Sequence, residues 1–241
     1  TKEAVRDYLI GFTAISATIT AAQNFYHAGD AVACEVSRTN LEGVGQAGAG
    51  KYELYLLKQP EETQRAAEIP ILLGQGKHTP GDSLRPRWEE GEGLSNTLFR
   101  WEDGPLVRAG ELTHDQTGRG AITFSSLKPG AYRLRYQTRD KWGAICRAQK
   151  ELVVAAAGMA LRASHYLLPL KQQVSVGQSL PVLIGTGFQN KPWVFEVWLG
   201  DELARREYRY SDGAPELLQL PIDGQMRGGI TLRLYLVEDY Q

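Results

Sequence analysis

Five carboxylates beside two tryptophans form the first group whose residue types could do chemistry. Glycosidases use two carboxylates about 5 to 10 Å apart, and a nearby aromatic ring could stack on a sugar. The group comprises Trp88, Glu89, Glu90, Glu92, Trp101, Glu102 and Asp103. The surrounding segment is rich in Gly, so it cannot hold two carboxylates in a fixed geometry by itself. We therefore interpret the group as part of a solvated loop.

The four histidines are the next candidates for acid–base chemistry: His27, His78, His114 and His165. His114 precedes Asp115, which could suggest a general base with its orienting carboxylate. Neighbouring residues of an extended chain point to opposite sides, so the two would not pair directly. The chain has no GxSxG nucleophile motif. His27 and His165 each adjoin a tyrosine, which indicates packing or surface positions, and no histidine is assigned a catalytic role.

The two cysteines, Cys34 and Cys146, lie outside any CxxC or Cys/His cluster, so no structural zinc site is predicted. We expect two small buried thiols on different strands. The alternative is a disulfide between them, which would require an oxidising compartment. The segment GQGKHTPG lacks the Ser or Thr that follows Lys in a phosphate-binding loop. No calcium-binding loop is present either. The sequence thus predicts a protein that is not an enzyme, with no catalytic, cofactor-binding or metal-binding residues and no cofactor.

An aromatic strand supplies the last candidate. If residues 193 to 198 alternate in a strand, Trp193, Phe195 and Val197 share one face, which we expect to be core. Trp198 then lies on the opposite face. It is a candidate for stacking on a sugar or packing against a neighbouring module.

Composition limits the class of protein. The chain has 241 residues, 42% hydrophobic and 23% charged, with a net charge of −1. This balance gives no electrostatic reason to expect nucleic acid or an anionic membrane as partner. No apolar run approaches the ~20 residues that span a bilayer, and no signal peptide is visible. The densest basic group, Arg205, Arg206 and Arg209 around Glu207, is interpreted as a solvated strand face. We interpret the chain as a fragment of a longer protein.

The elements that position these residues are expected to be strands, because a strand–turn–strand pattern occurs twice in the sequence. The first copy is ATITAAQNFYHAGDAVACEVSRTN from Ala17, and the second is YLLPLKQQVSVGQSLPVLIGTGFQN from Tyr166. In both, a Gly at the turn, Gly29 or Gly177, precedes apolar residues at alternate positions, which is typical of a half-buried strand. The repeat predicts an all-β chain of two tandem antiparallel, immunoglobulin-like sandwiches.

The predicted modules are 1–155 and 159–241, joined by a linker at 155–158. Strands of the first are expected at 15–20, 30–39, 51–59 and, as three further strands, within 121–154. A long insertion at about 60–120 should carry a short helix at 60–70, a Gly- and Pro-rich loop, and a hairpin of strands 98–101 and 106–109 about the Asp103-Gly104 turn. Strands of the second are expected at 161–168, 172–176, 179–185, 193–199, 203–210, 216–220 and 229–237.

Several segments in series resemble the macroglobulin-type sandwich domains of bacterial alpha-2-macroglobulins, most of all the large Bacteroidetes-like forms. They are YELYLLKQP, SLKPGAYRLRYQTRDKWGAICRAQKELVV, VGQSLPVLIGTGFQNKPWVFEVW and GGITLRLYLVEDYQ. The module-end pattern of that family matches Leu127, Lys128, Gly130, Tyr132, Asp140 and Gly143, and its final acidic pair matches Glu238 and Asp239. The family's Cys-x-x-Gln thioester is not matched: Cys146 and Gln149 have the spacing but lie in an alternating strand without the Gly-rich lead-in.

This resemblance implies a non-catalytic framework segment of a broad-range endopeptidase inhibitor, a protease trap of the periplasm or outer cell envelope. Its partners would be neighbouring domains of the same chain and, through the full-length protein, target proteases, with no nucleic acid and no direct membrane insertion. The first rival is a carbohydrate-binding or adhesin-like module that uses Trp88, Trp101 or Trp198. The second is a small β-rich hydrolase, which would need two of the acids, or His114 and a serine, to converge.

Overall fold

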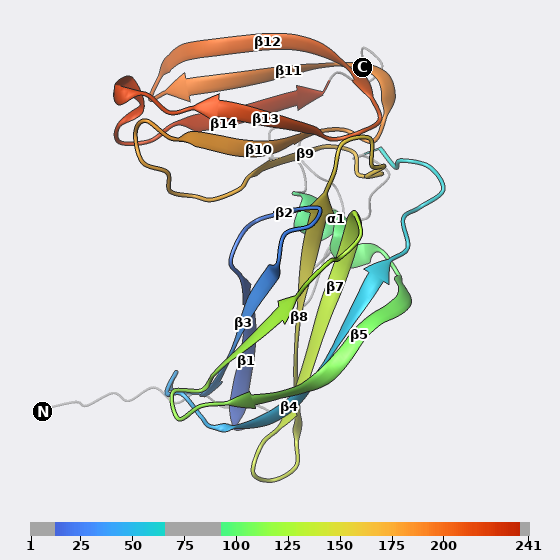
Figure 1. Cartoon of the computed structure of the whole chain (residues 1–241), viewed down its shortest axis with the longest axis vertical. Coiled ribbons are helices and arrows are strands. Elements are labelled where there is room, and N and C mark those ends of the chain that lie inside the picture. The colour runs from blue at the N-terminus through green and yellow to red at the C-terminus, as the bar shows by residue number, and fades with distance from the viewer. Residues whose placement is uncertain (1–12, 66–92, 237–241) are drawn as a thin grey trace, which may run out of the picture. The chain divides into compact units, whose positions relative to one another are not determined.

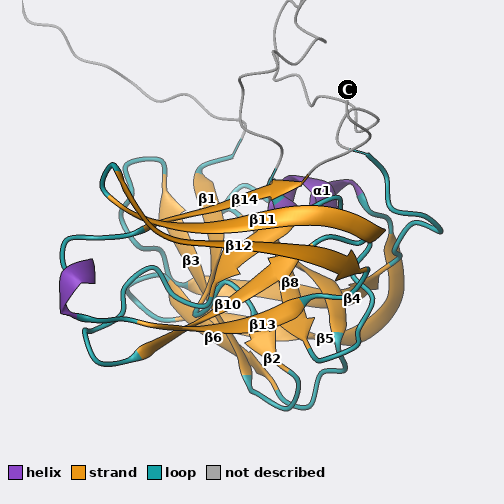
Figure 2. Cartoon of the chain, turned by 90° about the horizontal axis from the view of Figure 1, so that it is seen from above, coloured by secondary structure: helices purple, strands orange, loops and turns teal. Residues whose placement is uncertain are grey.

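Antiparallel strands form nearly all the regular structure of the computed structural model, which describes residues 13–65 and 93–236 (Figures 1 and 2). The chain divides into two compact units. Unit 1 combines Thr1–Leu57 with Asp103–Val154, and unit 2 combines Lys58–Glu102 with Ala155–Gln241. The expected all-β class with two sandwich-like domains is confirmed. The predicted limits of the modules, 1–155 and 159–241, stay a prediction.

Unit 1 is a sandwich of a three-stranded and a five-stranded sheet. The smaller sheet has the order β1-β3-β6, and the larger has the order β2-β8-β7-β4-β5. The bounds are β1 Ile15–Ala21, β2 Tyr26–His27, β3 Val32–Asn40, β4 Gly48–Leu57, β5 Asp103–His114, β6 Arg119–Phe124, β7 Gly130–Arg139 and β8 Ile145–Ala155. Alternate residues of both sheets meet in one core, which includes Val36, Leu54, Leu134 and Leu152.

Unit 2 contains two three-stranded sheets within the described residues. Their orders are β13-β10-β9 and β12-β11-β14. The bounds are β9 Tyr166–Pro169, β10 Ser179–Gly185, β11 Gln189–Leu199, β12 Glu202–Asp212, β13 Glu216–Pro221 and β14 Thr231–Leu236, with a 3₁₀ turn η3 at Gly224–Met226. Val182, Phe195 and Val197 lie at the centre of its core.

The two units share one strand order. The sheet β1-β3-β6 of unit 1 corresponds to β9-β10-β13 of unit 2, and the strands β5-β4-β7 correspond to β12-β11-β14. All eight strand pairs in these sheets are antiparallel. The turn glycines Gly29 and Gly177 have φ of +96° and +89°, a conformation that favours glycine, and each precedes the corresponding strand β3 or β10. The repeat seen in the sequence is therefore a repeat of topology.

The hairpin predicted about Asp103-Gly104 is wrong. Leu94–Arg100 is the short helix α1, which buries Leu94, Thr97 and Leu98, and Asp103–His114 is one continuous strand. Pairing of β5 with β4 along its whole length competes with the turn and replaces it. The Asp103 carboxylate accepts from Arg133 at 2.8 Å, so it is held by β7, which lies on the far side of β4 in the same sheet.

Four further expectations need correction. The predicted strand at 172–176 is a loop, and the strand predicted from 161 begins only at Tyr166. No helix forms over 60–65; the rest of that predicted helix, and most of the Gly- and Pro-rich loop, lie outside the described residues. The loop predicted at 40–50 is shorter than expected, since β4 already begins at Gly48.

Candidate functional site

The outer face of the β12-β11-β14 sheet gathers more exposed aromatic side chains than any other described strand surface. Trp193, Phe195 and Val197 point inward, as predicted, and are almost fully buried. The alternate residues of the three strands therefore point outward. We call this surface the aromatic face; it consists of Val194, Glu196, Trp198, Arg206, Tyr208, Tyr210, Arg233 and Tyr235.

Strand register arranges the aromatic face in rows. Val194 lies between Tyr208 of β12 and Tyr235 of β14, and Pro192 lies opposite Tyr210. Tyr208, Tyr210 and Tyr235 are 74%, 75% and 45% exposed. Directly opposite residues of antiparallel strands lie close enough for their side chains to touch. The strands therefore hold large aromatic surfaces side by side in solvent.

The next row carries charge. Glu196 lies between Arg206 of β12 and Arg233 of β14 and is only 3% exposed. Its carboxylate accepts from Arg206 Nε and from Trp198 Nε1, both at 2.6 Å. The Arg233 guanidinium lies 4.7 Å from the centre of the Trp198 ring, a cation–π contact. Trp198 is thus held in a fixed position on the face, only partly exposed.

These contacts determine the electrostatics of the face. Burial raises the pKa of Glu196, but the hydrogen bonds from Trp198 and Arg206, with the charges of Arg206 and Arg233, outweigh it and lower the pKa overall. The carboxylate is ionised and fully engaged, so it is a poor proton acceptor. Tyrosine, tryptophan and arginine are the residues that dominate protein interfaces. The arrangement suits binding rather than acid–base chemistry.

The other face of β12 differs from the solvated face that the sequence predicted. Arg205, Glu207 and Arg209 lie opposite Val197, Phe195 and Trp193 and so point to the core side of the sheet. Ion pairs join these charged side chains: Arg205–Glu207, Arg209–Glu207 and Arg209–Glu216. Inward-pointing charges are a device that protects an edge strand from pairing with another chain.

The carboxylate and tryptophan group does not come together where it is described. Trp101 is buried, so it offers no surface for a ligand. Exposed Glu102 pairs with Lys58 at 3.3 Å, while Asp103 binds Arg133 and Arg135 at 2.8 and 2.7 Å. The remaining members, Trp88, Glu89, Glu90 and Glu92, lie outside the described residues.

The histidines do not form a catalytic pair within the described residues. His114 is 3% exposed; its Nδ1 lies 3.3 Å from the Gly48 carbonyl oxygen and 3.5 Å from the Tyr136 hydroxyl, and its Nε2 has no hydrogen-bond partner. Asp115 instead accepts from Thr117 and from the Arg119 amide. Burial lowers the pKa of His114, and the Arg38 charge lowers it further against the opposing bond to Gly48.

Of the other histidines, His27 packs edge-on against Phe25 at 5.4 Å, and His165 Nδ1 lies 3.0 Å from the Ser164 hydroxyl. These are packing and local polar contacts. His78 lies outside the described residues.

Both cysteines are buried free thiols on different strands, as predicted. Burial raises the pKa of Cys34 to about 11 and also raises that of Cys146. A thiol that stays protonated is a poor nucleophile. The Gln149 amide donates to Glu151 at 3.2 Å, in keeping with its place in a strand rather than in a thioester.

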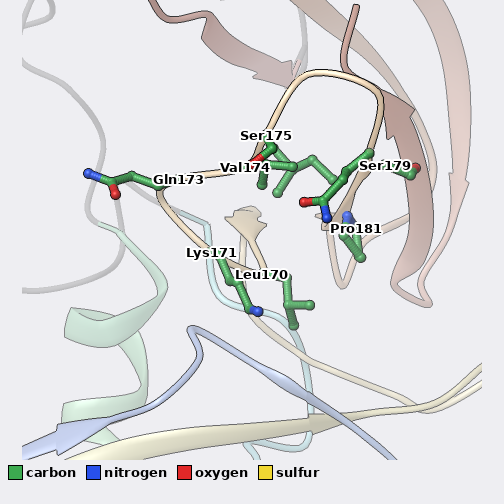
Figure 3. A pocket seen from close by; sticks show the side chains of 9 residues that line it. Leu170, Lys171, Gln173, Val174, Ser175, Ser179 and Pro181 are labelled. Carbon is green, nitrogen blue, oxygen red and sulfur yellow. The ribbon is translucent and has the colours of Figure 1, made fainter.

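Metal-binding clusters and membrane-spanning helices are two further features to consider in residues 13–65 and 93–236. No group of three or more His, Cys, Asp or Glu that could hold a metal occurs there, and no helix there is long and apolar enough to cross a membrane. A hollow beside the β9–β10 loop is lined by Leu170, Lys171, Ser175 and Ser179 among others, with Gln173 pointing away from Ser179 and Pro181 (Figure 3). The residues that line the hollow all come from the β9–β10 loop and the start of β10, so it does not bring together side chains from distant parts of the sequence.

Comparison with known proteins gives structural matches only. Neither a scan of protein-family models nor a search of curated proteins finds a significant match. Escherichia coli alpha-2-macroglobulin activated by porcine elastase aligns with TM-score 0.37 and 9% identity over 95% of this chain and 22% of its own. Salmonella alpha-2-macroglobulin reacted with methylamine aligns with TM-score 0.36 and 13% identity over 97% of this chain and 16% of its own. A tetra-tandem repeat from the extending region of a large adhesion protein aligns with TM-score 0.34 and 10% identity over 93% of this chain and 50% of its own.

The chain thus spans about a fifth or less of the two macroglobulin chains. The expected resemblance to bacterial alpha-2-macroglobulin is found as a low structural similarity, and no family match in sequence accompanies it. TM-scores and identities this low carry no weight for function. The fold is defined here by its own strand order.

Sequence reasoning found Trp198 but missed the three exposed tyrosines. The signal was present, because Arg206, Tyr208 and Tyr210 alternate with Arg205, Glu207 and Arg209. The interpretation of the whole stretch as one solvated face overlooks this alternation. Separating its two faces requires the register with β11, which the sequence does not give.

Proposed function

We propose that this chain is a non-catalytic framework segment of a bacterial alpha-2-macroglobulin-like endopeptidase inhibitor of the cell envelope. The single observation that carries the proposal is the repetition of one strand order in two consecutive units. Sandwich modules in series suit a protein whose parts must hold a defined spacing. The partners would be neighbouring domains of the same polypeptide and, through the whole protein, the proteases that it traps.

The charge distribution of unit 1 supports a framework role. Arg133 is buried on the outward side of its sheet and binds Asp103 at 2.8 Å and Glu151 at 3.0 Å. Arg135 binds the other oxygen of Asp103 at 2.7 Å. Such a network links β5, β7 and β8 and resists sliding between these strands. Rigid sheets are what a protein needs if cleavage elsewhere is to release strain between its modules.

An inhibition assay on the full-length parent tests the proposal. The parent is mixed with a serine endopeptidase, and the residual activity is measured on a large protein substrate and on a small peptide substrate. A trap should block the large substrate and spare the small one. Replacing this segment by a flexible linker of equal length should abolish the difference. Equal activity on both substrates with the intact parent would overturn the proposal.

A second candidate, a carbohydrate-binding or adhesin-like module, is favoured by the exposed tyrosines of the aromatic face. Calorimetric titration with soluble bacterial polysaccharides tests it. Binding that is lost in the double variant Tyr208→Ala, Tyr210→Ala, and retained in Trp142→Ala, would establish it. Trp142 is a matched control, since it is equally exposed but lies on a loop of unit 1. Absence of binding by the unaltered chain to every polysaccharide would reject it.

A further inference from the structure

We propose that a groove in unit 2 binds an extended acidic segment of a partner protein, which places apolar side chains in the groove and carboxylates at its rim. The groove has a volume of about 480 Å³. Two stretches far apart in the sequence line it: residues 171–180, which lead into β10, and residues 222–230, which connect β13 to β14. The proposal does not depend on the protease-trap function.

Apolar side chains make up half of the groove's lining. Leu180 and Ile222 are only 6% and 8% exposed and belong to the core of unit 2. Val174, Met226 and Ile230 pack against that core and are half-buried. The groove is therefore a place where the apolar core of unit 2 reaches the surface. Covering such a surface with apolar side chains of a partner is favourable.

Backbone hydrogen bonds tie the two lining stretches together. The Gly177 amide donates to the Ile222 carbonyl oxygen at 2.7 Å, and the Ile222 amide donates to the Gln178 carbonyl oxygen at 2.9 Å. The 3₁₀ turn η3 that follows is closed by Asp223, whose carboxylate accepts from the Gln225 amide at 2.9 Å. The groove is therefore formed by paired backbone, and a ligand would not have to order it.

The charge at the rim of the groove is positive. Lys171 on one stretch and Arg227 on the other both line the groove and are exposed. Among residues 13–65 and 93–236, no Asp or Glu lines the groove, and neither cation forms an ion pair. Asp223, the acidic residue nearest to Arg227 in the sequence, is engaged in the η3 turn. Two cations without a counter-charge favour an anionic partner.

The openness of the groove favours a polypeptide over the alkyl chain of a lipid. Sites for small molecules enclose most of the ligand surface, but here Val176 is 43% exposed, and Gln172, Gln173 and Gly228 also line the groove from exposed positions. Such a groove covers only one side of its ligand. An extended peptide suits it, because alternate side chains point to opposite sides, so one set is buried while the other stays in water. The glutamine amides can bond to its backbone.

Titration of the 241-residue chain with short end-blocked peptides, followed by NMR of the backbone amides, tests this inference. The probe alternates leucine with aspartate, and two control peptides replace every aspartate with lysine or every leucine with serine. The probe should shift the amides of Val174, Val176, Arg227 and Ile230 and leave that of Tyr208, on the aromatic face, unshifted. Each control should bind at least about tenfold more weakly, since it lacks either the charge or the apolar contacts.

Charge reversal in the protein tests the two cations. The double variant Lys171→Glu, Arg227→Glu should bind the lysine peptide about tenfold more tightly than the aspartate peptide, the reverse of the unaltered chain. The double variant Lys128→Glu, Arg147→Glu changes the net charge equally at exposed sites of unit 1 and should keep the original preference. All four side chains are exposed, so both variants should fold.

Several results would overturn the inference. They are an absence of amide shifts in the groove with the aspartate peptide, equal binding of the aspartate and lysine peptides by the unaltered chain, and an unchanged preference in the Lys171→Glu, Arg227→Glu variant. Decanoate is the probe for a lipid-like ligand, and tighter binding of decanoate than of the aspartate peptide would assign the groove to amphiphiles instead. Sedimentation tests a second copy: a dimer of the unaltered chain that is lost in the groove variant would show that another copy fills the groove, and would also overturn the inference.

Discussion

Strands β7 and β14 hold equivalent positions in two sandwiches of the same order, yet one is central and the other is an edge within the described residues. Both alternate apolar residues inward, and both pair with the corresponding strand, β4 or β11. Among residues 13–65 and 93–236, only β7 of the two has a strand on each side, and its inward residues are buried whereas those of β14 are half-buried. The comparison teaches that alternation sets which face of a strand is apolar, while the neighbouring strand determines how much that face contributes to stability.

The units also differ in how they use arginine. Unit 1 buries Arg133 between two carboxylates at the middle of a sheet. Unit 2 places Arg209 on its edge strand, one-third exposed, with Glu207 and Glu216. A buried ion pair is costly to break by removing one partner, whereas a solvent-screened pair contributes little. The first arrangement fixes strands, and the second protects an edge.

Matched leucine truncations give the largest expected difference between the units. Leu134→Ala should lower the free energy of unfolding of unit 1 by about 2 to 5 kcal/mol, because it opens a cavity in a closed core. Leu234→Ala should cost unit 2 about 1 kcal/mol, since the side chain already contacts solvent. Urea titrations that follow each unit by its own probes measure both losses. Equal losses would mean that β14 is as enclosed as β7.

The arginines provide the next contrast. Arg133→Ala should destabilise unit 1 by about 2 kcal/mol, since Glu151 stays nearly buried and loses its cationic partner while Asp103 keeps Arg135. Arg209→Ala should cost unit 2 less than about 1 kcal/mol. Thermal unfolding at low and high salt checks both, and only the smaller loss should shrink with salt. A larger loss for Arg209 than for Arg133 would reverse our assignment of roles.

Acid should act on unit 1 through His114, whose pKa is lowered in the folded state. The unfolded chain then binds the proton more tightly, so stability rises with pH in this range. The contribution is complete above about pH 6.5, the unfolded value, and is lost as the pH falls toward the folded pKa. Arg38 and Asp115 act on His114 through their charges, and its ring contacts the Tyr136 hydroxyl. The pH titration of unfolding free energy measures it.

His114→Gln should flatten that pH dependence below pH 6.5, and His27→Gln, a more exposed site, is the control. An unaltered pH profile in His114→Gln would assign the acid sensitivity to other groups. Because the reference pKa values of carboxylates lie well below that of histidine, the test is confined to the range where histidine gains its proton.

The smallest effect is expected on the aromatic face. Tyr208→Ser and Tyr210→Ser should change the free energy of unfolding by less than about 0.5 kcal/mol each, because both side chains are mostly solvated. A loss above about 1 kcal/mol would mean that the tyrosines are structural, and the face would lose its interest as a binding surface. Chemical denaturation measures these differences.

Alternation alone was enough to predict strands such as β1, β7, β10 and β13, and the inward face of β11. It failed for β5, where the Asp103-Gly104 turn signal is overridden by pairing with β4. It also failed for α1, whose seven residues form a helix with no side-chain N-cap. Tertiary packing decides such short segments. The aromatic face needed the β11–β12 register, and the burial of Trp101 needed the fold around it.

Residue-resolved hydrogen exchange of the 241-residue chain, comparing β7 with β14, tests most directly the claim that these strands are equivalent in order but different in enclosure. We predict protection at consecutive amides along β7, because neighbours on both sides accept its hydrogen bonds. In β14 only every second amide, the set facing β11, should be protected. Protection of consecutive amides along β14, equal to that of β7, would contradict the account.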